Sequence, residues 1–350
     1  MAKGEKVKGI RQLAERLNIS IGTVSRALNG RPDVNEDTRR RVLEAAAEFG
    51  YVPNQSGRSL RQGTTNAIGF MIESGTDTAG NPDNFFLGVF DGVQTVLSRH
   101  HLDLVVLPCA TDEDPTQYLQ RMVTRRLVDA LIISATHRKD KRIELLNAAR
   151  IPFIALGRSA TPGDHPWIDL DFEGVANRAI DRLVAKGHRR IAVGVPSNDI
   201  NLGFVFLDAY RAALARHGIA YDQSLVIRAA SSEQGGYQMA HEVLTMASPA
   251  TAIVLIYELM AIGFYRRLNE AGLSPGRDIA VIAFRESPLS RFLSPTLTCF
   301  RMSLRDLGIA LGESLLASMP PYSEIYPQGI VRRVWPMELV EGGSDQPAKP

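Results

Sequence analysis

The sequence predicts an α/β protein with a small N-terminal helical head and a large body of two lobes built on parallel sheets. Three observations lead to this prediction. Two short amphipathic helical patterns, separated by three residues, lie near the start of the chain. A polar segment that contains glycine follows at residues 55–64. Beyond it, short apolar runs alternate with helical patterns in two successive series, which is typical of parallel strands covered by helices on both faces.

The composition is that of a globular chain. Its 350 residues are 45% hydrophobic and 22% charged, which excludes a collagen-like, low-complexity or wholly disordered protein. Two cysteines are too few for a disulfide framework. Cys109 and Cys299 both lie in apolar, strand-like runs, so we expect buried thiols in a reducing compartment. No apolar run approaches the roughly 18 residues of a membrane span, and no signal peptide is evident, so we expect a cytoplasmic protein without membrane contact.

The overall charge of +2 is the sum of a positively charged N-terminal part and a negatively charged remainder. Residues 1–63 contain 12 Lys and Arg against 7 Asp and Glu, a net charge of +5. The remainder of the chain therefore carries a net charge of −3. A basic head on a slightly acidic body indicates a polyanion-binding segment attached to a separate globular module.

The head has the spacing of a helix-turn-helix. The first helical pattern covers residues 10–17, with apolar side chains on one face. Asn18 tolerates the left-handed backbone that ends a helix, and Ser20 is a good N-cap for a second helix over 21–28. A third helix should begin after the N-cap candidate Asn35. Its expected apolar face consists of Val42, Leu43, Ala46 and Phe49.

The second helix presents Thr23, Ser25 and Arg26 to solvent. In a helix-turn-helix this helix enters the major groove of DNA. Hydroxyl groups suit phosphate oxygens, and a guanidinium group suits the O6/N7 edge of guanine. A three-helix bundle that binds nothing would show the same spacing, so the identity of the residues must decide.

These residues resemble the headpiece of the lactose/galactose repressor family of bacterial transcriptional regulators. The stretches that carry the resemblance are Ser20–Gly30, Val34–Thr38, Arg41–Ala45 and Gly50–Gln55. The resemblance implies a DNA-binding headpiece at residues 1–54 and a hinge helix at 55–64. We expect a homodimer on palindromic double-stranded operator DNA, because one headpiece buries too little surface for specific binding and two-fold symmetry matches a palindrome. No Cys/His grouping has metal-ligand spacing, and we expect neither a metal nor a cofactor.

The resemblance also assigns DNA contacts to matched positions. Base edges would be read by Ile21, Gly22 and Arg26. Phosphates would be held by Ser20, Thr23, Ser25, Asn29, Asn35, Thr38, Tyr51 and Asn54. Gly22 replaces the longer polar side chain that the family often carries, so readout there is lost or passes to Ile21. Leu60 matches the hinge leucine that wedges into the minor groove and kinks the duplex.

The body contains eight apolar runs in two series. The first series consists of Ala67–Ile72, Leu102–Leu107, Ala130–Ile133 and Phe153–Leu156. The second consists of Trp167–Leu170, Ile191–Gly194, Thr251–Leu255 and Ile279–Ala283. Helical patterns are expected at 86–100, 115–126, 142–149, 174–186, 207–217 and up to residue 271.

The family resemblance continues through the body, to about residue 340. It implies a periplasmic-binding-protein-like core over 65–340, with two lobes joined by three crossovers. Lobe one would comprise 67–159 plus 288–320, and lobe two 160–287 plus 325–340. The polar tail 341–350 is expected to be disordered.

A pocket between the lobes is expected, because ligands of open parallel sheets bind at the carboxyl ends of the strands. The resemblance implies a small effector there, most often a sugar. The candidate effector-binding residues are Phe85, Phe86, Arg158, Trp167, Asp171, Phe206, Tyr257, Glu258 and Arg285. The aromatic candidates could stack on a sugar or belong to the core.

The charge layout of this pocket departs from the family. The arginine that often clamps the ligand falls at Phe206, and an aspartate of the family falls at Arg285. Arg285 could hold a carboxylate, a phosphate or a pair of sugar hydroxyls. It could equally form an internal ion pair with Glu258 or Glu286.

Two other classes of function fit the sequence less well. An enzyme would need a catalytic or metal motif, and the sequence contains no G-x-S-x-G, G-x-x-x-x-G-K-[ST] or H-E-x-x-H pattern. A transport-type binding protein would need an export signal and would have no use for the head. We therefore expect a repressor of a carbohydrate-utilisation operon that a sugar releases from its operator. A ligand-activated activator, or a corepressor-dependent repressor that responds to a non-sugar or phosphorylated metabolite, stays open.

Overall fold

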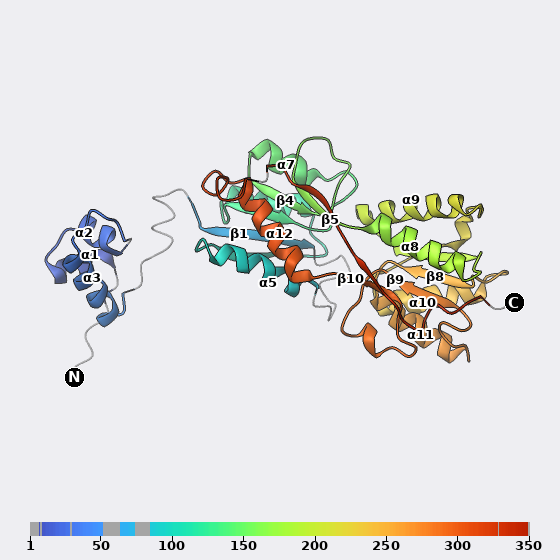
Figure 1. Ribbon diagram of the computed structural model, residues 1–350. Coiled ribbons are helices and arrows are strands. Elements are labelled where there is room, and N and C mark those ends of the chain that lie inside the picture. Colours follow the sequence, from blue (N-terminus) through green and yellow to red (C-terminus); the bar gives the residue numbers. More distant parts are fainter. Residues whose placement is uncertain are drawn as a thin grey trace. The chain divides into compact units, whose positions relative to one another are not determined.

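The computed structural model describes residues 7, 9–28, 30–51, 64–73, 85–327 and 329–348. The chain divides into two compact units, residues 1–65 and 66–350 (Figure 1). Each unit is described by itself below. The predicted fold class, helical head followed by an α/β body with parallel sheets, is confirmed.

The head contains the three predicted helices. They are α1 (Ile10–Leu17), α2 (Ile21–Leu28) and α3 (Glu36–Glu48). Asn18 ends α1 in the left-handed conformation, with φ 51° and ψ 45°. The Ser20 hydroxyl accepts a hydrogen bond from the backbone N–H of Thr23 at 3.0 Å, and Asn35 caps α3 by accepting from the N–H of Asp37 at 2.8 Å. The expected caps therefore set one boundary of each helix: the end of α1 and the starts of α2 and α3.

One residue of the predicted head core lies on the surface. Leu43 is 49% exposed, whereas Ala45 is buried with Val42 and Ala46 in the centre of the bundle. A helix turns by about 100° per residue, so positions 42, 45, 46 and 49 share one face and position 43 does not. The prediction for Leu43 was wrong because it followed hydrophobicity rather than helical spacing.

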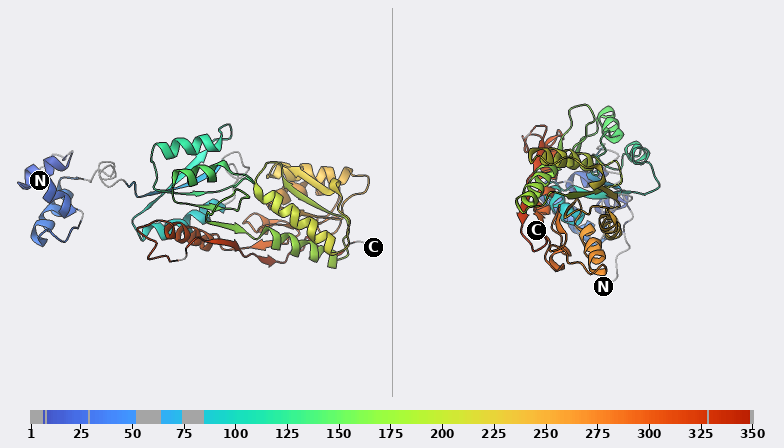
Figure 2. Two further views of the ribbon diagram at one scale, coloured as in Figure 1. Left: turned by 90° about the horizontal axis from the view of Figure 1, so that it is seen from above. Right: turned by 90° about the vertical axis from the view of Figure 1, so that its right-hand side faces the viewer.

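The first lobe of the body is built on a six-stranded parallel sheet with the order β11-β5-β4-β3-β1-β2. Its strands are β1 (Ala67–Glu73), β2 (Asp103–Cys109), β3 (Ala130–Ile133), β4 (Phe153–Leu156), β5 (Trp167–Leu170) and β11 (Arg332–Trp335). Helices α5 (Phe85–Ser98) and α12 (Leu304–Ala317) cover one face, and α6 (Pro115–Thr124) and α7 (Lys141–Ala149) cover the other (Figure 2). Alternate residues of each central strand enter the two cores, which explains the unbroken apolar runs.

The second lobe contains a four-stranded parallel sheet with the order β7-β6-β8-β9. Its strands are β6 (Ile191–Pro196), β7 (Val226–Ala229), β8 (Ala252–Leu255) and β9 (Ala280–Ala283). Helices α8 (Phe172–Ala185) and α9 (Asn201–Arg216) cover one face, and α10 (Glu233–Thr245) and α11 (Leu259–Glu270) cover the other. Helix α9 begins six residues before the predicted Leu207. Strand β7 and helices α10 and α12 were not among the predicted elements.

The lobe boundaries differ from the predicted ones. The sequence places β5 and β11 in the second lobe, but both strands belong to the first sheet: Ala155 of β4 pairs with Trp167 of β5, and Asp169 of β5 pairs with Val334 of β11. The chain crosses between the lobes after β5, after β10 (Cys299–Arg301) and before β12 (Glu338–Val340). Because β4 and β5 are joined by a loop without a helix, the start of β5 resembled the start of a new series.

The described part of the C-terminal tail, residues 341–348, is part of the second lobe. It was expected to be disordered, yet Ser344 and Asp345 are fully buried. The Ser344 carbonyl accepts a hydrogen bond from the N–H of Val281 in β9 at 2.7 Å. The Asp345 carboxylate accepts hydrogen bonds from Arg182 and from the Thr298 hydroxyl, the latter at 2.6 Å. These contacts supply the ordering that a polar composition could not reveal.

Asp345 holds this tail through a buried ion cluster. Besides Arg182, the Lys186 ammonium group lies 2.8 Å from its carboxylate. Burial opposes ionisation of Asp345, but the hydrogen bonds from Arg182, Lys186 and Thr298 outweigh it and lower its pKa. Asp345 is therefore ionised at neutral pH, and its negative charge joins α8 to the C-terminal segment.

We expect Asp345→Asn to lower the free energy of unfolding by about 2–3 kcal/mol at pH 7, because it breaks a buried ion pair. A lowered pKa in the folded state means that the contribution is present above about pH 4 and is lost as the pH falls further. The difference between the two proteins should therefore shrink in acid. Urea denaturation at several pH values measures it. Asp181→Asn is the matched control, because Asp181 forms exposed pairs only, with Arg216 and His217, and the substitution should change stability by less than about 1 kcal/mol.

Candidate functional site

The head presents the start of α2 to solvent. The Ser20 hydroxyl caps the helix and forms a second hydrogen bond, at 2.8 Å, with the Thr23 hydroxyl. Both hydroxyls therefore lie beside the N-terminus of α2, where free backbone N–H groups favour anions. This edge of the helix can hold a phosphate oxygen.

Arg26 extends from the same helix, and its side chain is half exposed. Its Nε lies 3.4 Å from the carboxylate of Asp33, which is also exposed. Exposed pairs of this kind contribute little to stability, so Arg26 can exchange Asp33 for another partner at small cost. Gly22 is exposed nearby, and a Cβ added there would be 3.8 Å from the Arg26 guanidinium group.

The other predicted DNA contacts are spread over the head. Ile21 is half-buried against the head core, and Ser25, Thr38 and Tyr51 are half-buried as well. Asn35 is exposed at the start of α3, where its side chain serves as the helix cap. Three predicted residues, Asn29, Asn54 and Leu60, lie outside the described residues. The described candidates thus gather on α2 and at the start of α3, with Tyr51 just beyond α3.

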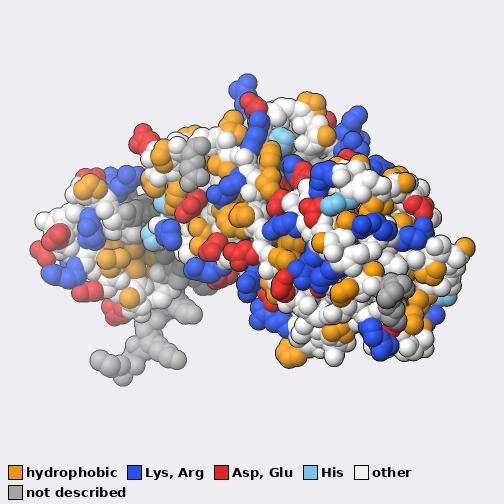
Figure 3. Space-filling model, turned by 45° about the vertical axis from the view of Figure 1, so that its right-hand side comes forward, with side chains coloured by type: hydrophobic (Ala, Val, Ile, Leu, Met, Phe, Trp, Pro, Cys, Tyr) orange, Lys and Arg blue, Asp and Glu red, His pale blue; other side chains and the backbone are white. Residues whose placement is uncertain are grey.

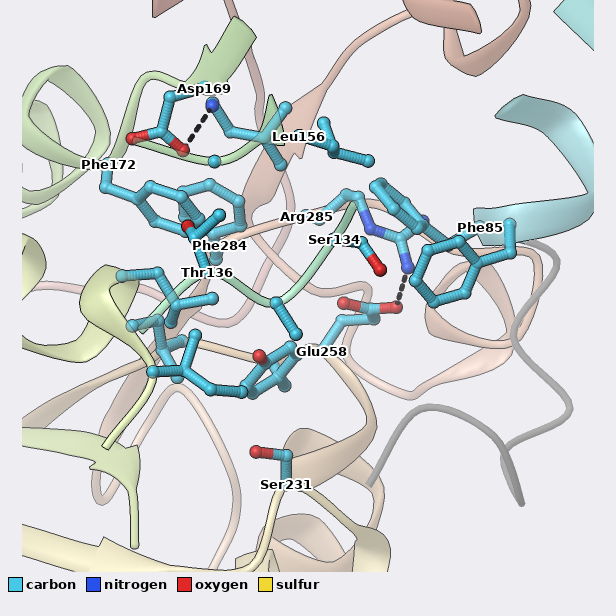
Figure 4. Close-up of a pocket in the computed structure, with 18 of the residues that line it drawn as sticks. Phe85, Ser134, Thr136, Leu156, Asp169, Phe172, Ser231, Glu258, Phe284 and Arg285 are labelled. Carbon is cyan, nitrogen blue, oxygen red and sulfur yellow. Dashed lines mark hydrogen bonds and ion pairs between the residues drawn. The ribbon is translucent and has the colours of Figure 1, made fainter. Parts of the chain in front are cut away.

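The body contains a cavity at the carboxyl ends of strands from both sheets (Figure 4). The first lobe contributes Phe85, Phe86, Ser134, Ala135, Thr136, Leu156, Gly157, Arg158, Asp169 and Leu170. The second lobe contributes Phe172, Ile200, Leu202, Ser231, Ile256, Tyr257, Glu258, Leu259, Phe284 and Arg285. Aromatic rings and aliphatic side chains form most of the wall, and hydroxyl and charged groups are interspersed among them.

One pair of opposite charges lies on the first-lobe side of the cavity. The Arg158 Nε donates a hydrogen bond to Asp169 at 2.7 Å, and its Nη2 donates to Glu173. Burial raises the pKa of Asp169 to about 6, although the hydrogen bond and the charge of Arg158 lower it. Asp169 can therefore change its protonation state near neutral pH.

A second pair lies across the cavity. The Arg285 Nη2 donates to the Glu258 carboxylate at 2.6 Å, and both side chains are buried (Figure 4). The Arg285 guanidinium group also lies 5.2 Å from the centre of the Phe85 ring. Of the two internal partners considered for Arg285, the structure pairs it with Glu258; the Glu286 carboxylate pairs with Arg291 at 3.0 Å.

Three predicted pocket residues do not line the described cavity. Asp171 caps α8 by accepting from the N–H of Gly174 at 2.8 Å, so its carboxylate is committed to the helix. Phe206 is 1% exposed and packs behind the cavity wall against Phe284. Trp167 lies at the start of β5, away from its carboxyl end, and its ring is 5.7 Å from the Arg158 guanidinium group. These corrections follow from helix capping, burial and strand direction.

Several lining residues were missed. Three of them carry hydroxyl groups: Ser134 and Thr136 follow β3, and Ser231 follows β7. The other two, Phe172 and Phe284, stack face to face with ring centres 4.5 Å apart. The signal for the hydroxyl residues was their position just after an apolar strand, because the carboxyl ends of parallel strands meet at one edge. No local pattern marks the stacked phenylalanines, which are 112 positions apart in the chain.

The two lobes touch at the rim of the cavity. The backbone N–H of Asn201, at the start of α9, donates to the Thr136 carbonyl at 2.8 Å. Its side-chain amide donates to the Arg158 carbonyl, also at 2.8 Å. The Arg138 guanidinium group lies 5.0 Å from the centre of the Phe204 ring. The rim is therefore bridged by both backbone and side-chain contacts.

Comparison with known proteins decides the family. Residues 9–54 match the family described as bacterial regulatory proteins, lacI family, and residues 180–344 match a periplasmic binding protein-like domain. The HTH-type transcriptional regulator AglR of Rhizobium meliloti strain 1021 is 34% identical over 345 residues, which is 97% of this chain and 94% of AglR. The chain belongs to the LacI family of bacterial transcriptional regulators. The relatives are regulators and not enzymes.

Other members of the LacI family are similar over most of their length. The HTH-type transcriptional regulator RafR of Escherichia coli is 31% identical over 303 residues, covering 85% of this chain and 88% of RafR. A solved Lac repressor dimer, bound to operator and the anti-inducer ONPF, has a TM-score of 0.83 at 23% identity and covers 98% of this chain and all of its own. A CelR–cellobiose complex has a TM-score of 0.71 at 24% identity and covers 97% and 100%. These two structures share the fold of this LacI-family chain.

Charged side chains of both signs are mixed on the visible surface of the body (Figure 3). On the face shown in Figure 3, the Lys and Arg side chains of the body lie interspersed with Asp and Glu. None of the helices in the described ranges is both long and apolar enough to cross a membrane.

We expect Arg158→Gln to raise the pKa of Asp169 above 6, because it removes the hydrogen bond and the charge that oppose the effect of burial. A titration of protein with carboxyl-labelled aspartate, followed by NMR, measures this change. Arg138→Gln is the control, since Arg138 is an exposed rim arginine that contacts Phe204. An unchanged or lower pKa of Asp169 in Arg158→Gln would show that Arg158 does not stabilise the ionised form.

Proposed function

We propose that this LacI-family chain represses a carbohydrate-utilisation operon in the cytoplasm and that a small sugar releases it from its operator. The observation that carries the proposal is the cavity at the ends of both sheets, where hydroxyl and charged groups lie among aromatic and aliphatic side chains. Sugars present apolar ring faces and polar edges, and such a wall suits both. The solved CelR structure contains cellobiose, and a LacI-family regulator from Enterococcus faecium contains ribose.

We assign recognition of the operator base sequence to α2. Base edges are read by Ile21, Gly22 and Arg26. Phosphates are held by Ser20, Thr23, Ser25, Asn29, Asn35, Thr38, Tyr51 and Asn54, and Leu60 wedges into the minor groove. The capped start of α2 and the loosely paired Arg26 support this assignment, because they leave hydroxyl and guanidinium groups accessible.

A homodimer is part of the proposal. Strand β2 is an edge of the first sheet, and Val105 and Val106 in it are more than one-third exposed. Leu87 of α5 is exposed as well, and α5 contacts β2. In the second lobe Phe292 is 87% exposed. An apolar sheet edge in water invites pairing, and a second copy would cover it while supplying the second head for a palindromic operator.

The first test concerns base reading. Arg26→Ala should weaken operator binding by about 1–3 kcal/mol and relax the preference at one base pair of each half-site. Thr23→Ala should weaken binding to all sequences alike, because phosphates carry no sequence information. Fluorescence anisotropy with a base-by-base operator series measures both. Arg40→Ala is the control, since Arg40 is an exposed arginine of α3 paired with Asp37. An unaltered base preference in Arg26→Ala would exclude its reading role.

The second test concerns the dimer. Val106→Glu should convert the protein to a monomer and abolish tight operator binding, because a charge would be buried in the proposed interface. Analytical ultracentrifugation measures the mass. Leu127→Glu is the matched control: Leu127 is also exposed, but it lies beyond α6 and outside the proposed interface. A Val106→Glu protein that stays dimeric would place the interface elsewhere.

A further inference from the structure

The charges that line the cavity balance one another. Among the described residues, the charged lining groups are two arginines and two carboxylates: Arg158, Asp169, Glu258 and Arg285. Arg158 is paired with Asp169, and Arg285 is paired with Glu258. A ligand that enters this cavity therefore meets no net positive charge from these groups.

The pair of Arg285 and Glu258 is the more deeply buried of the two. Glu258 is 2% exposed and Arg285 is 7% exposed, and their closest atoms are 2.6 Å apart. To reach the Arg285 Nη2 group, an anionic ligand would have to displace the Glu258 carboxylate, which accepts a hydrogen bond from that group. The displaced carboxylate would then remain buried beside a second negative charge, which is strongly unfavourable.

Glu258 is held where it can act on Arg285. It precedes the first residue of α11 and lies three residues beyond Leu255, the end of β8, and the N–H of Ala261 donates to its carbonyl at 3.0 Å. Arg285 follows the end of β9, the neighbouring strand in the sheet. The two side chains therefore project from adjacent strand ends toward one another, as Figure 4 shows.

We infer that Glu258 is a specificity-determining residue: by occupying Arg285 it closes the cavity to phosphorylated and carboxylated ligands and leaves it open to uncharged, polyhydroxylated ones. The inference rests on the proposed function, because it concerns the effector of the same site. It narrows the effector to a neutral sugar. It also predicts that removal of the negative charge of Glu258 weakens the selection against anions, even when the length of the side chain is kept.

Glu258→Gln tests this inference directly. Glutamine keeps the length of the side chain and an oxygen that can accept from Arg285, but it removes the negative charge of Glu258. The full-length variant should bind inorganic phosphate and glucose 6-phosphate at least tenfold more tightly than the native chain, which corresponds to about 1.4 kcal/mol. Isothermal titration calorimetry at constant ionic strength measures the change.

Two controls locate the effect. Asp91→Asn removes one negative charge from α5, where Asp91 pairs with Arg305 and is exposed, and should leave phosphate binding at the native level. The double variant Glu258→Gln/Arg285→Gln should lose the gained affinity. This loss separates the cavity from the basic head, which also attracts phosphate.

The phosphate titrations of these variants can support or overturn the inference. No gain in phosphate affinity in a folded Glu258→Gln protein, or a gain that survives Arg285→Gln, overturns the inference. If Glu258→Gln does not fold, titration of the native chain with glucose 6-phosphate still tests the inference. Binding by the native chain that Arg285→Gln abolishes overturns the inference. No binding of glucose 6-phosphate by the native chain supports it. Failure of the chain to recognise any operator would overturn the proposed function without changing these titrations.

Discussion

Strand direction is the constraint on which the effector cavity depends. All strands of the two large sheets are parallel to their neighbours, so the carboxyl ends of each sheet meet at one edge. The residues just beyond those ends, such as Thr136 after β3 and Glu258 after β8, line a single cavity although 122 positions separate them in the chain. The helices and crossovers serve to hold these edges opposite one another.

The buried charges of the body fall into two kinds. Asp345 is held by two cations and a hydroxyl and joins the C-terminal segment to α8, so its role is structural. Two other ion pairs line the effector cavity: Arg158 with Asp169, and Arg285 with Glu258. Such pairs contribute little net stability once desolvation is counted, which favours a role in selectivity over one in holding the fold.

Much of the fold could be predicted from local patterns, and the failures have physical causes. The caps at Asn18, Ser20 and Asn35 depend only on neighbouring residues, so their prediction was accurate. Leu43 was wrongly predicted to be buried, because the prediction followed its hydrophobicity and not its position on the helix. The boundary at residue 159 was wrong because strand pairing between β4 and β5 is a contact between segments and has no local signature.

The sequence by itself determined the family, the three-helix head, the alternation of strands and helices, and the presence of Arg158, Glu258 and Arg285 in the pocket. Only the tertiary structure decided which partners these charges have, that Asp171 and Phe206 lie outside the cavity wall, and that the tail is buried. The physical reason is range. Helix caps and periodicity act over a few residues, whereas ion pairs and burial join atoms that the chain brings together only when it is folded.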